Sequence, residues 1–352
     1  MTTWEPIASG SLATEAFAAL DDINNALPQP GAVAADVALA PDASLASGEA
    51  GLALYWGYQS LSSGTFEHAE RSLAHLDQAI AAVAETVLSE CLYSGFTGIA
   101  WVTEHLRGRV LHGTPDMNAP IDEALVADLQ RTRLRPFDLI IGLVGVGLYS
   151  VDRTHHPRGR TCLTQVLRHL EVSAERPLEG ATWFTPPELS SATQRTYGPR
   201  GHYNLGVAHG VPGVIGLLGT AIAQGAQSPN TRALLDDAVR WLLSCRLPDA
   251  RPTVFPTYVV DGSLGSDSRS AWCYGDPGVA IAVLIAARAT ENAAWEDLAV
   301  GWLHKCARRP ILSAGVHDAG LCHGAAGLAY VLAVPRVDGR SGARHRSRRE
   351  YA

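Results

Sequence analysis

The sequence has little charge, and the charge that it carries is not basic. Asp, Glu, Lys and Arg make up 18% of the 352 residues, and the formal net charge is -7. The pI is near 6.0, whereas nucleic-acid-binding domains usually carry a clustered excess of Lys and Arg. The composition therefore predicts no nucleic-acid partner, while a hydrophobic fraction of 47% can supply a large buried core.

Long apolar runs and a secretory signal are also absent. A transmembrane helix needs about 20 consecutive apolar residues, and no run of about 18 occurs here. The first residues lack the basic start and the apolar stretch of a signal peptide. We therefore expect a cytoplasmic protein with no direct membrane span.

The cysteines are too few and too scattered for a disulfide framework. A reducing compartment makes thiol or metal roles more suitable for them than bridges. Four lie singly in apolar or helical contexts and are predicted to be packed core thiols: Cys91, Cys162, Cys245 and Cys306. The other two, Cys273 and Cys322, have a different context.

Signals for β-structure are sparse. Segment 253–260 is a candidate strand before the Asp261-Gly262 turn, although Pro256 weakens it. Segment 176–203 is rich in Pro, Gly, Ser and Thr and predicts a long loop, which in a compact domain is often functional. Its aromatic pair, Trp183-Phe184, either lines a substrate groove or covers the loop.

The chain does contain a repeated glycine pattern. Six times, a glycine, two variable residues and a second glycine precede a run rich in Ala, Val, Leu and Ile. The first glycines are Gly48, Gly95, Gly142, Gly210, Gly275 and Gly324. They lie 47, 47, 68, 65 and 49 residues apart, and such periods indicate a helical array.

The runs after the glycines differ from the segments between them. Segment 279–287 is apolar on every side and predicts a buried helix, whereas 230–243 has apolar residues at helical spacing and predicts an amphipathic one. Buried helices that alternate with amphipathic ones predict an inner and an outer ring. Glycine lets the backbone turn tightly and approach closely where each inner helix begins.

Two of these helix starts carry metal-binding residue types. Cys273 lies shortly before the fifth glycine pair, and Cys322 and His323 lie directly before the sixth. Two thiolates and an imidazole suit a Zn²⁺ ion whose fourth position stays open for chemistry. Such a thiolate-rich site favours activation of a substrate thiol over hydrolysis. A closed structural site is the alternative, because His317 can supply a fourth ligand.

Other polar residues stand where an apolar helical array needs none. They are Asp138, His209, Arg269 and Tyr274. Because equivalent ends of the inner helices converge at one end of a ring, we expect these side chains to face a common cavity. His209 is then a candidate acid/base that Asp138 orients.

These segments resemble the lanthipeptide cyclases, also called lanthionine synthetase C proteins, over about residues 47–332. The resemblance rests on Asn204-Leu205-Gly206-Val207-Ala208-His209-Gly210-Val211-Pro212-Gly213, Arg269-Ser270-Ala271-Trp272-Cys273-Tyr274-Gly275 and Cys322-His323-Gly324. The last two motifs together are specific, whereas a Gly-x-x-Gly pattern alone is not.

The resemblance implies an all-α fold, an α/α toroid, in which six helical hairpins are recognisable. It implies the Zn²⁺ ligands Cys273, Cys322 and His323, surrounded by Asp138, His209, Arg269 and Tyr274. The implied reaction is addition of a peptide cysteine thiol to dehydroalanine or dehydrobutyrine, which gives (methyl)lanthionine rings. His209 would protonate the α-carbon, while the separate roles of Arg269 and Tyr274 stay open. The implied partners are a dehydrated precursor peptide with its leader, a dehydratase and an exporter.

Other functions can use the same residues. One is addition of glutathione or another small thiol to dehydrated residues, and another is a non-catalytic scaffold that binds the peptide. A glycan-processing toroid is a weaker rival, because it needs a carboxylate pair and has no use for Cys322 and His323.

One departure from the family concerns the end of the chain. The family's toroid has seven inner helices, and at the observed spacing a seventh would begin beyond Ala352. We expect a single cyclase-like domain over 1–335, followed by an Arg-rich disordered tail over 336–352. The toroid is then expected to be incomplete on one side and less stable, with its zinc ligands intact and its activity in doubt.

Overall fold

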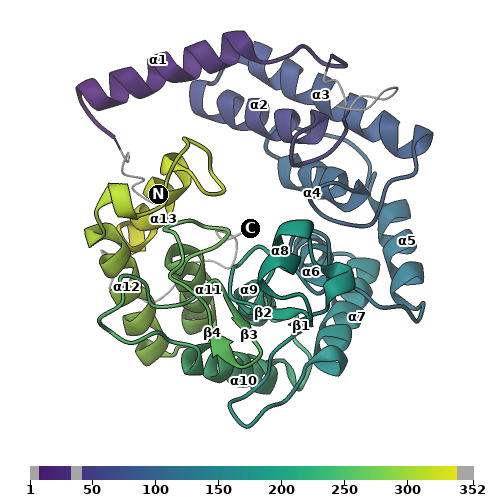
Figure 1. Ribbon diagram of the computed structural model, residues 1–352. Coiled ribbons are helices and arrows are strands. Elements are labelled where there is room, and N and C mark those ends of the chain that lie inside the picture. Colours follow the sequence, from purple (N-terminus) through teal and green to yellow (C-terminus); the bar gives the residue numbers. More distant parts are fainter. Residues whose placement is uncertain (1–7, 33–41, 339–352) are drawn as a thin grey trace.

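The protein is a ring of helices (Figure 1). The computed structural model describes residues 8–32 and 42–338. Of the predicted disordered tail over 336–352, residues 336–338 are helical, and the rest lies outside the described residues. Helices dominate, as predicted, and the helical hairpins follow one another around the ring. Within the described ranges, no helix is both long and apolar enough to cross a membrane.

The ring has two layers. The inner layer consists of α2(Glu49–Ser63), α4(Phe96–Leu106), α6(Leu143–Asp152), α9(Val211–Ala223), α11(Asp276–Ala289) and α13(Ala325–Asp338). The outer layer consists of α3(Phe66–Glu85), α5(Ala119–Leu129), α7(Pro157–Ser173), α10(Thr231–Ser244) and α12(Ala293–Arg308). Each inner helix packs against the next inner helix along the chain, and the first five also pack against the outer helix that follows them. The predicted alternation of inner and outer helices is confirmed.

Every inner helix begins directly after the first glycine of a predicted pair. The N-cap residues of the first five are Gly48, Gly95, Gly142, Gly210 and Gly275. A Cβ on Gly95 would lie 2.1 Å from the carbonyl oxygen of Ser89, and a Cβ on Gly210 would lie 2.1 Å from that of Asn204. Glycine is required because the preceding chain folds back over the helix start.

The seven residues that end at each of these glycines form a loop that we call a lead-in loop. The lead-in loops are 42–48, 89–95, 136–142, 204–210, 269–275 and 318–324. Backbone hydrogen bonds join neighbouring loops: Tyr93 N–H donates to the Ile140 carbonyl at 3.2 Å, Ala208 to Cys273 at 3.3 Å and Cys273 to Cys322 at 3.2 Å. The loops therefore form a band at one end of the inner helices, with equivalent positions side by side.

A four-stranded antiparallel sheet supplements the ring, and the sequence patterns indicated only part of it. Its strands, in order, are β1(Phe184–Thr185), β2(His202–Asn204), β3(Tyr258–Val260) and β4(Ser263–Leu264). β3 lies in the candidate strand segment, and the turn to β4 has positive φ at Asp261 (49°) and Gly262 (75°), as tight hairpins require. β2 runs directly into lead-in loop 204–210 and so anchors it.

The segment expected to be one long loop, 176–203, is partly ordered into short elements. It contains β1, the 3₁₀ helix η1(Pro187–Leu189), the helix α8(Ala192–Tyr197) and the first two residues of β2. The long-loop prediction was therefore wrong in part. The reason is local capping at α8, where the Ser191 hydroxyl accepts the backbone N–H of Gln194 and the Gln194 side chain accepts that of Ser191.

The two ends of the ring differ from the predictions in detail. The sequence patterns did not indicate α1(Ser11–Ala26), which has no buried residue and touches α2 through a 2.7 Å hydrogen bond from Tyr55 to Asn24. In Figure 1, α1 borders the sector between α2 and α13. At the other end, α13 reaches Asp338 and so passes the expected domain boundary at 335.

The core consists of a larger and a smaller hydrophobic cluster, together with a small third cluster of Ala208, Ala271 and Cys273 on the lead-in loops. The larger one extends from α4 to α13, and the smaller one joins α2, α3 and α4 through residues such as Ala53, Leu76 and Ile99. Leu45 and Trp101 pack against both clusters. All four predicted core thiols are buried and free, as expected.

Candidate metal and catalytic site

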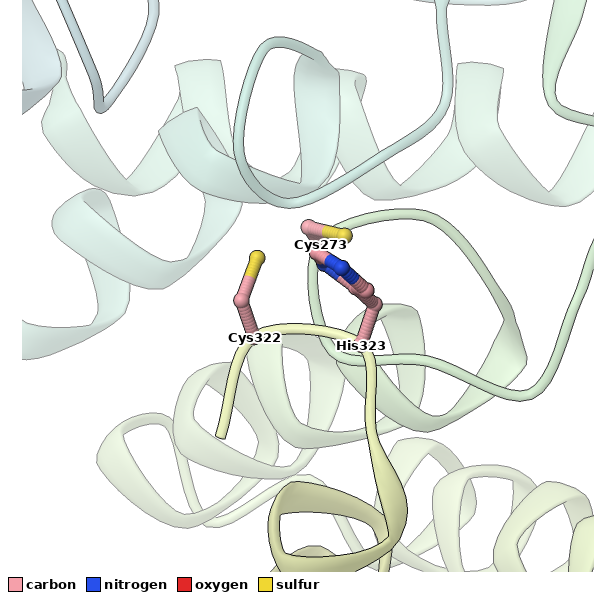
Figure 2. A group of neighbouring side chains, drawn as sticks. All are labelled: Cys273, Cys322 and His323. Carbon is pink, nitrogen blue, oxygen red and sulfur yellow. The ribbon is translucent and has the colours of Figure 1, made fainter. Parts of the chain in front are cut away.

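Two adjacent lead-in loops bring together the predicted metal ligands. Figure 2 shows Cys273 approaching from one loop, and Cys322 and His323 from the next. Their ligand atoms all lie within 4.8 Å of one another, and no other such group of His, Cys, Asp or Glu occurs in the described part of the chain. The Cys273–Cys322 backbone hydrogen bond fixes the relative position of the two loops.

The donor set fits a Zn²⁺ ion. Zinc bonds to sulfur and nitrogen are about 2.0–2.3 Å long, so small movements would bring all three ligand atoms onto one ion. Burial, and then the neighbouring Cys273 thiol, raise the pKa of Cys322. Two thiolates at this spacing thus need a cation to offset their charge. His317 is exposed and is not a member of the group, so this arrangement does not support the closed four-ligand alternative.

A carboxylate that the sequence reasoning missed holds the metal-site histidine. His323 Nε2 lies 3.2 Å from Asp318 Oδ2, and Asp318 Oδ1 accepts the Gly320 N–H at 2.7 Å. A carboxylate that engages one ring nitrogen of a histidine leaves the other nitrogen oriented for a metal. Its position in the sequence could have indicated this role, because Asp318 is the first residue of the lead-in loop that contains Cys322 and His323.

His209 and Asp138 form a hydrogen-bonded pair across two lead-in loops. His209 Nδ1 lies 2.8 Å from Asp138 Oδ2, while Asp138 Oδ1 accepts the Ile141 N–H at 2.8 Å. The side chain of His209 is 30% exposed and that of Asp138 is 11% exposed. A carboxylate at Nδ1 favours the tautomer with the proton on that nitrogen, which leaves Nε2 available for proton transfer.

Tyr274 is held between the histidine and two side-chain amides. Its ring stacks on that of His209 with centroids 6.1 Å apart. Its hydroxyl lies 3.1 Å from Asn204 Nδ2 and 3.2 Å from Gln194 Nε2. Burial raises the pKa of Tyr274, and the two hydrogen bonds oppose this shift. No sequence pattern indicated Gln194, and Asn204 stood out only as the first residue of the motif 204–213, because the tyrosine that both contact comes from a distant segment.

A groove of about 850 Å³ brings three of the four candidate catalytic residues to one surface, whereas Asp138, expected to face the same cavity, does not line it. His209, Arg269 and Tyr274 all line it, and Glu188 and Tyr197 line it from η1 and α8. An Arg269 Nη atom donates to Cys273 Sγ at 3.3 Å. Arg269 thereby connects the groove to the candidate metal ligands Cys273, Cys322 and His323, which we call the metal group. All seven predicted site residues therefore lie on the lead-in loops, linked by direct contacts or sequence adjacency.

Another residue that the sequence reasoning missed is Tyr93. It holds the same lead-in position as Cys273 and Cys322, two residues before the glycine. Burial and the nearby thiols of those two cysteines raise the pKa of Tyr93 to about 12. Tyr93 therefore borders the metal group on the side of the second lead-in loop.

The aromatic pair Trp183-Phe184 lies apart from this groove. Trp183 is 1% exposed, and its indole N–H donates to the Leu170 carbonyl at 2.9 Å. Together with Phe184 and Asp138 it borders a second cavity of about 240 Å³. Trp183 is thus mainly a core residue, while the half-buried Phe184 lies on β1.

The family model described as "Lanthionine synthetase C-like protein" matches residues 40–335. The chain belongs to this lanthionine synthetase C-like family. The "Nisin biosynthesis protein NisC" of Lactococcus lactis subsp. lactis is 23% identical over 266 residues, which are 70% of this chain and 62% of that protein. The match thus spans less than two thirds of the curated relative.

The fold likeness agrees with the family match. A solved structure of "Nisin cyclase" superposes with a TM-score of 0.73 and 20% sequence identity, covering 93% of this chain and 81% of that chain. At this identity the likeness shows a shared fold. The helical ring of this protein is therefore the toroid that the sequence resemblance implied.

Proposed function

We propose that this protein is a Zn²⁺-dependent cyclase that forms (methyl)lanthionine thioether rings in a dehydrated precursor peptide with a leader. The observation that carries the proposal is the group of Cys273, Cys322 and His323, linked through Arg269 to the groove that His209 lines. Membership of the lanthionine synthetase C-like family and the likeness to proteins named for nisin support it.

Cys273, Cys322 and His323 would hold the ion in this scheme. Bound Zn²⁺ would supply a Lewis-acidic centre that favours the thiolate form of a substrate cysteine at neutral pH. Asp318 would orient His323, and Arg269 would place a positive charge beside Cys273. These residues keep the charge of the thiolates balanced and the ligands in place.

The groove residues would then assist bond formation. The substrate sulfur forms a C–S bond to the β-carbon of the dehydro residue, and the π electrons move to the α-carbon and its carbonyl oxygen as an enolate. Arg269 or Tyr274 donates a hydrogen bond to that oxygen. His209, protonated and paired with Asp138, gives its proton to the α-carbon. The thiol loses one proton and the α-carbon gains one, so the addition is balanced.

The reaction requires a substrate in which Ser or Thr has already lost water. We therefore propose a dehydratase as the preceding enzyme and an exporter as a further partner. We propose that this protein meets both of them in the cytoplasm. We also propose that residues 1–335 act as one domain, because the site draws on four consecutive lead-in loops of the same ring.

The test is cyclisation without an external thiol. Zinc-loaded protein is incubated with a dehydrated precursor peptide, and free cysteines are then alkylated with N-ethylmaleimide and measured by mass spectrometry. We expect alkylation to disappear with time, because ring formation consumes the thiol. A cysteine that stays fully alkylatable would refute the cyclase, and a mass adduct formed only when glutathione is present would favour small-thiol addition.

His209→Asn is the matched active-site variant for this assay. Loss of a general acid/base typically lowers kcat about 10²- to 10⁴-fold, and we expect that range here with unchanged zinc content. A variant that cyclises at the wild-type rate would remove His209 from the mechanism. If cells still produce the mature peptide although the wild-type protein cyclises nothing, the non-catalytic scaffold is the better explanation.

A further inference from the structure

The hydroxyl of Tyr274 is engaged by two side-chain amides whose orientation can be determined. Asn204 Oδ1 accepts the Gly206 N–H at 2.9 Å, so Asn204 Nδ2 must be the atom that faces Tyr274. Gln194 Oε1 accepts the Ser191 N–H at 2.7 Å, so Gln194 Nε2 must face Tyr274 as well. Each amide oxygen is committed to a backbone donor, and flipping either amide would break that bond.

The Tyr274 hydroxyl oxygen accepts two hydrogen bonds, one from each amide, and these fill its capacity as an acceptor. A tyrosine hydroxyl has one O–H donor and a small number of lone pairs. Because both amides donate to it, neither can accept the Tyr274 proton. No acceptor for that proton is recorded among the residues described, and Tyr274 lines the groove. The O–H is therefore left available to an acceptor in the groove.

The ring of Tyr274 is fixed as firmly as its hydroxyl. It lies so close to Gly206 that a Cβ there would be 2.6 Å from the Tyr274 Cδ1 atom. A second constraint on the ring is the stacked imidazole of His209. Asn204 is fully buried in the loop that also carries Gly206 and His209, so one lead-in loop supplies three of the contacts that position the tyrosine.

We propose that Gln194 and Asn204 are positioning residues that hold Tyr274 as an obligatory hydrogen-bond donor to the carbonyl oxygen of the substrate's dehydro residue. The inference rests on the proposed cyclase function and separates the roles of Tyr274 and Arg269. Tyr274 serves the developing enolate oxygen, while Arg269, whose guanidinium contacts Cys273, serves the metal end of the groove.

Gln194 is the informative residue to change, because its side chain does two things. It completes the capping box of α8 and it donates to Tyr274. Gln194→Glu keeps an acceptor for the Ser191 N–H but replaces the amide donor with a carboxylate, which accepts the Tyr274 proton. Ser191→Ala removes the capping hydroxyl and leaves the Gln194 amide in place. The two variants therefore separate the helix cap from the donor.

The kinetic test uses zinc-loaded full-length protein and a synthetic peptide with one dehydroalanine and one cysteine separated by three residues. We expect Gln194→Glu to lower kcat about 10- to 100-fold, a loss no larger than that from Tyr274→Phe. KM should change less than about threefold, and the zinc content should stay the same. Ser191→Ala should lose far less. The double variant Gln194→Glu/Tyr274→Phe should be no worse than Tyr274→Phe alone, because both changes remove the same interaction.

Two results would overturn the proposal. Additive losses in the double variant would show that Gln194 acts independently of Tyr274. A larger loss in Ser191→Ala than in Gln194→Glu would show that the helix cap alone matters. Asn204→Asp repeats the polarity change on the other amide and guards against a folding defect confined to α8.

A second readout does not depend on the cyclase activity. Protein labelled with ¹³C at the tyrosine ζ-carbon gives one NMR signal for Tyr274, assigned through its absence in Tyr274→Phe. We expect Gln194→Glu to shift that signal and Ser191→Ala to leave it in place; an unshifted signal in Gln194→Glu contradicts the positioning role. If the wild-type protein shows the expected NMR response but cyclises nothing, the proposed function fails while the hydrogen-bond arrangement stands.

Discussion

At the residue scale, the chemistry of the site depends on side chains from loops far apart in the sequence. Cys273, Cys322 and His323 were predictable, because their types and their places before glycine pairs indicate a metal site on their own. Asp318 and Gln194 were not, since a carboxylate or an amide gains its role only from the partner that the fold places beside it. Residue type thus indicated the candidate ligands, and only the structure showed which side chains lie beside them.

Cys273 is the buried member of the metal group, so its removal should abolish metal binding. We expect purified wild-type protein to carry about one zinc ion, and Cys273→Ala to lose it, because two remaining ligands bind zinc weakly. Elemental analysis by mass spectrometry measures this. Cys306→Ala is the control, since Cys306 is a buried thiol in α12. Equal zinc in wild type and Cys273→Ala would contradict the ligand assignment.

Asp318 should matter for metal affinity without being a ligand. Outer partners of a metal-bound histidine typically contribute about 10- to 100-fold in affinity, and we expect Asp318→Asn to weaken Zn²⁺ binding by that factor. Competition with a chromogenic chelator gives the dissociation constants. Asp249→Asn, at a side chain that is 97% exposed, serves as control. An affinity equal to that of the wild type would mean that Asp318 only shapes its loop.

At the element scale, helix starts were the most predictable feature and strands the least. Each glycine pair indicated an inner helix, because only glycine tolerates the folded-back loop at positions such as Gly95 and Gly210. β1 and β2 are two and three residues long, and their pairing joins segments far apart in sequence. No local pattern distinguishes such short strands from a loop, whereas the Asp261-Gly262 hairpin had its own turn signal.

The lead-in glycines should tolerate a side chain poorly. A Cβ on Gly95 would meet backbone atoms of Ser89 and Cys91 closer than 3.0 Å, so we expect Gly95→Ala to lower the free energy of unfolding by about 1–3 kcal/mol. Gly301→Ala in α12 meets no atom within 4 Å and should instead add about 0.5–1 kcal/mol. Denaturant unfolding compares them. The idea fails if Gly95→Ala is as stable as the wild type.

At the scale of the whole molecule, the hairpins are arranged like repeats whose neighbours stabilise them. The sequence predicted the ring and its two layers because the repeat imposes them. It did not predict α1, which lacks a glycine pair and buries no residue. Nor did it predict the division of the core, since that depends on which side chains of α4 face which neighbour.

The first hairpin should open more easily than the centre of the ring. It belongs to the smaller core cluster, whereas α9 and α11 lie within the larger one, and terminal repeats have fewer stabilising neighbours. Native-state hydrogen exchange should therefore give a lower opening free energy for amides of α2 and α3 than for those of α9 and α11. The same opening free energy in both regions would indicate a single cooperative unit.

The band of lead-in loops carries the candidate site residues, whereas the helices behind it carry most of the hydrophobic core. In every loop the two residues before the glycine project from the same place on the same scaffold, and they are Ala46-Ser47 in the first repeat but Cys322-His323 in the last. Packing sets the glycines and the apolar helices behind them, and it also buries Ala208 and Cys273. The residue directly before the glycine, by contrast, is not buried in any of the six loops. A change of chemistry in this fold would therefore need substitutions in the lead-in loops and would leave the helices as they are.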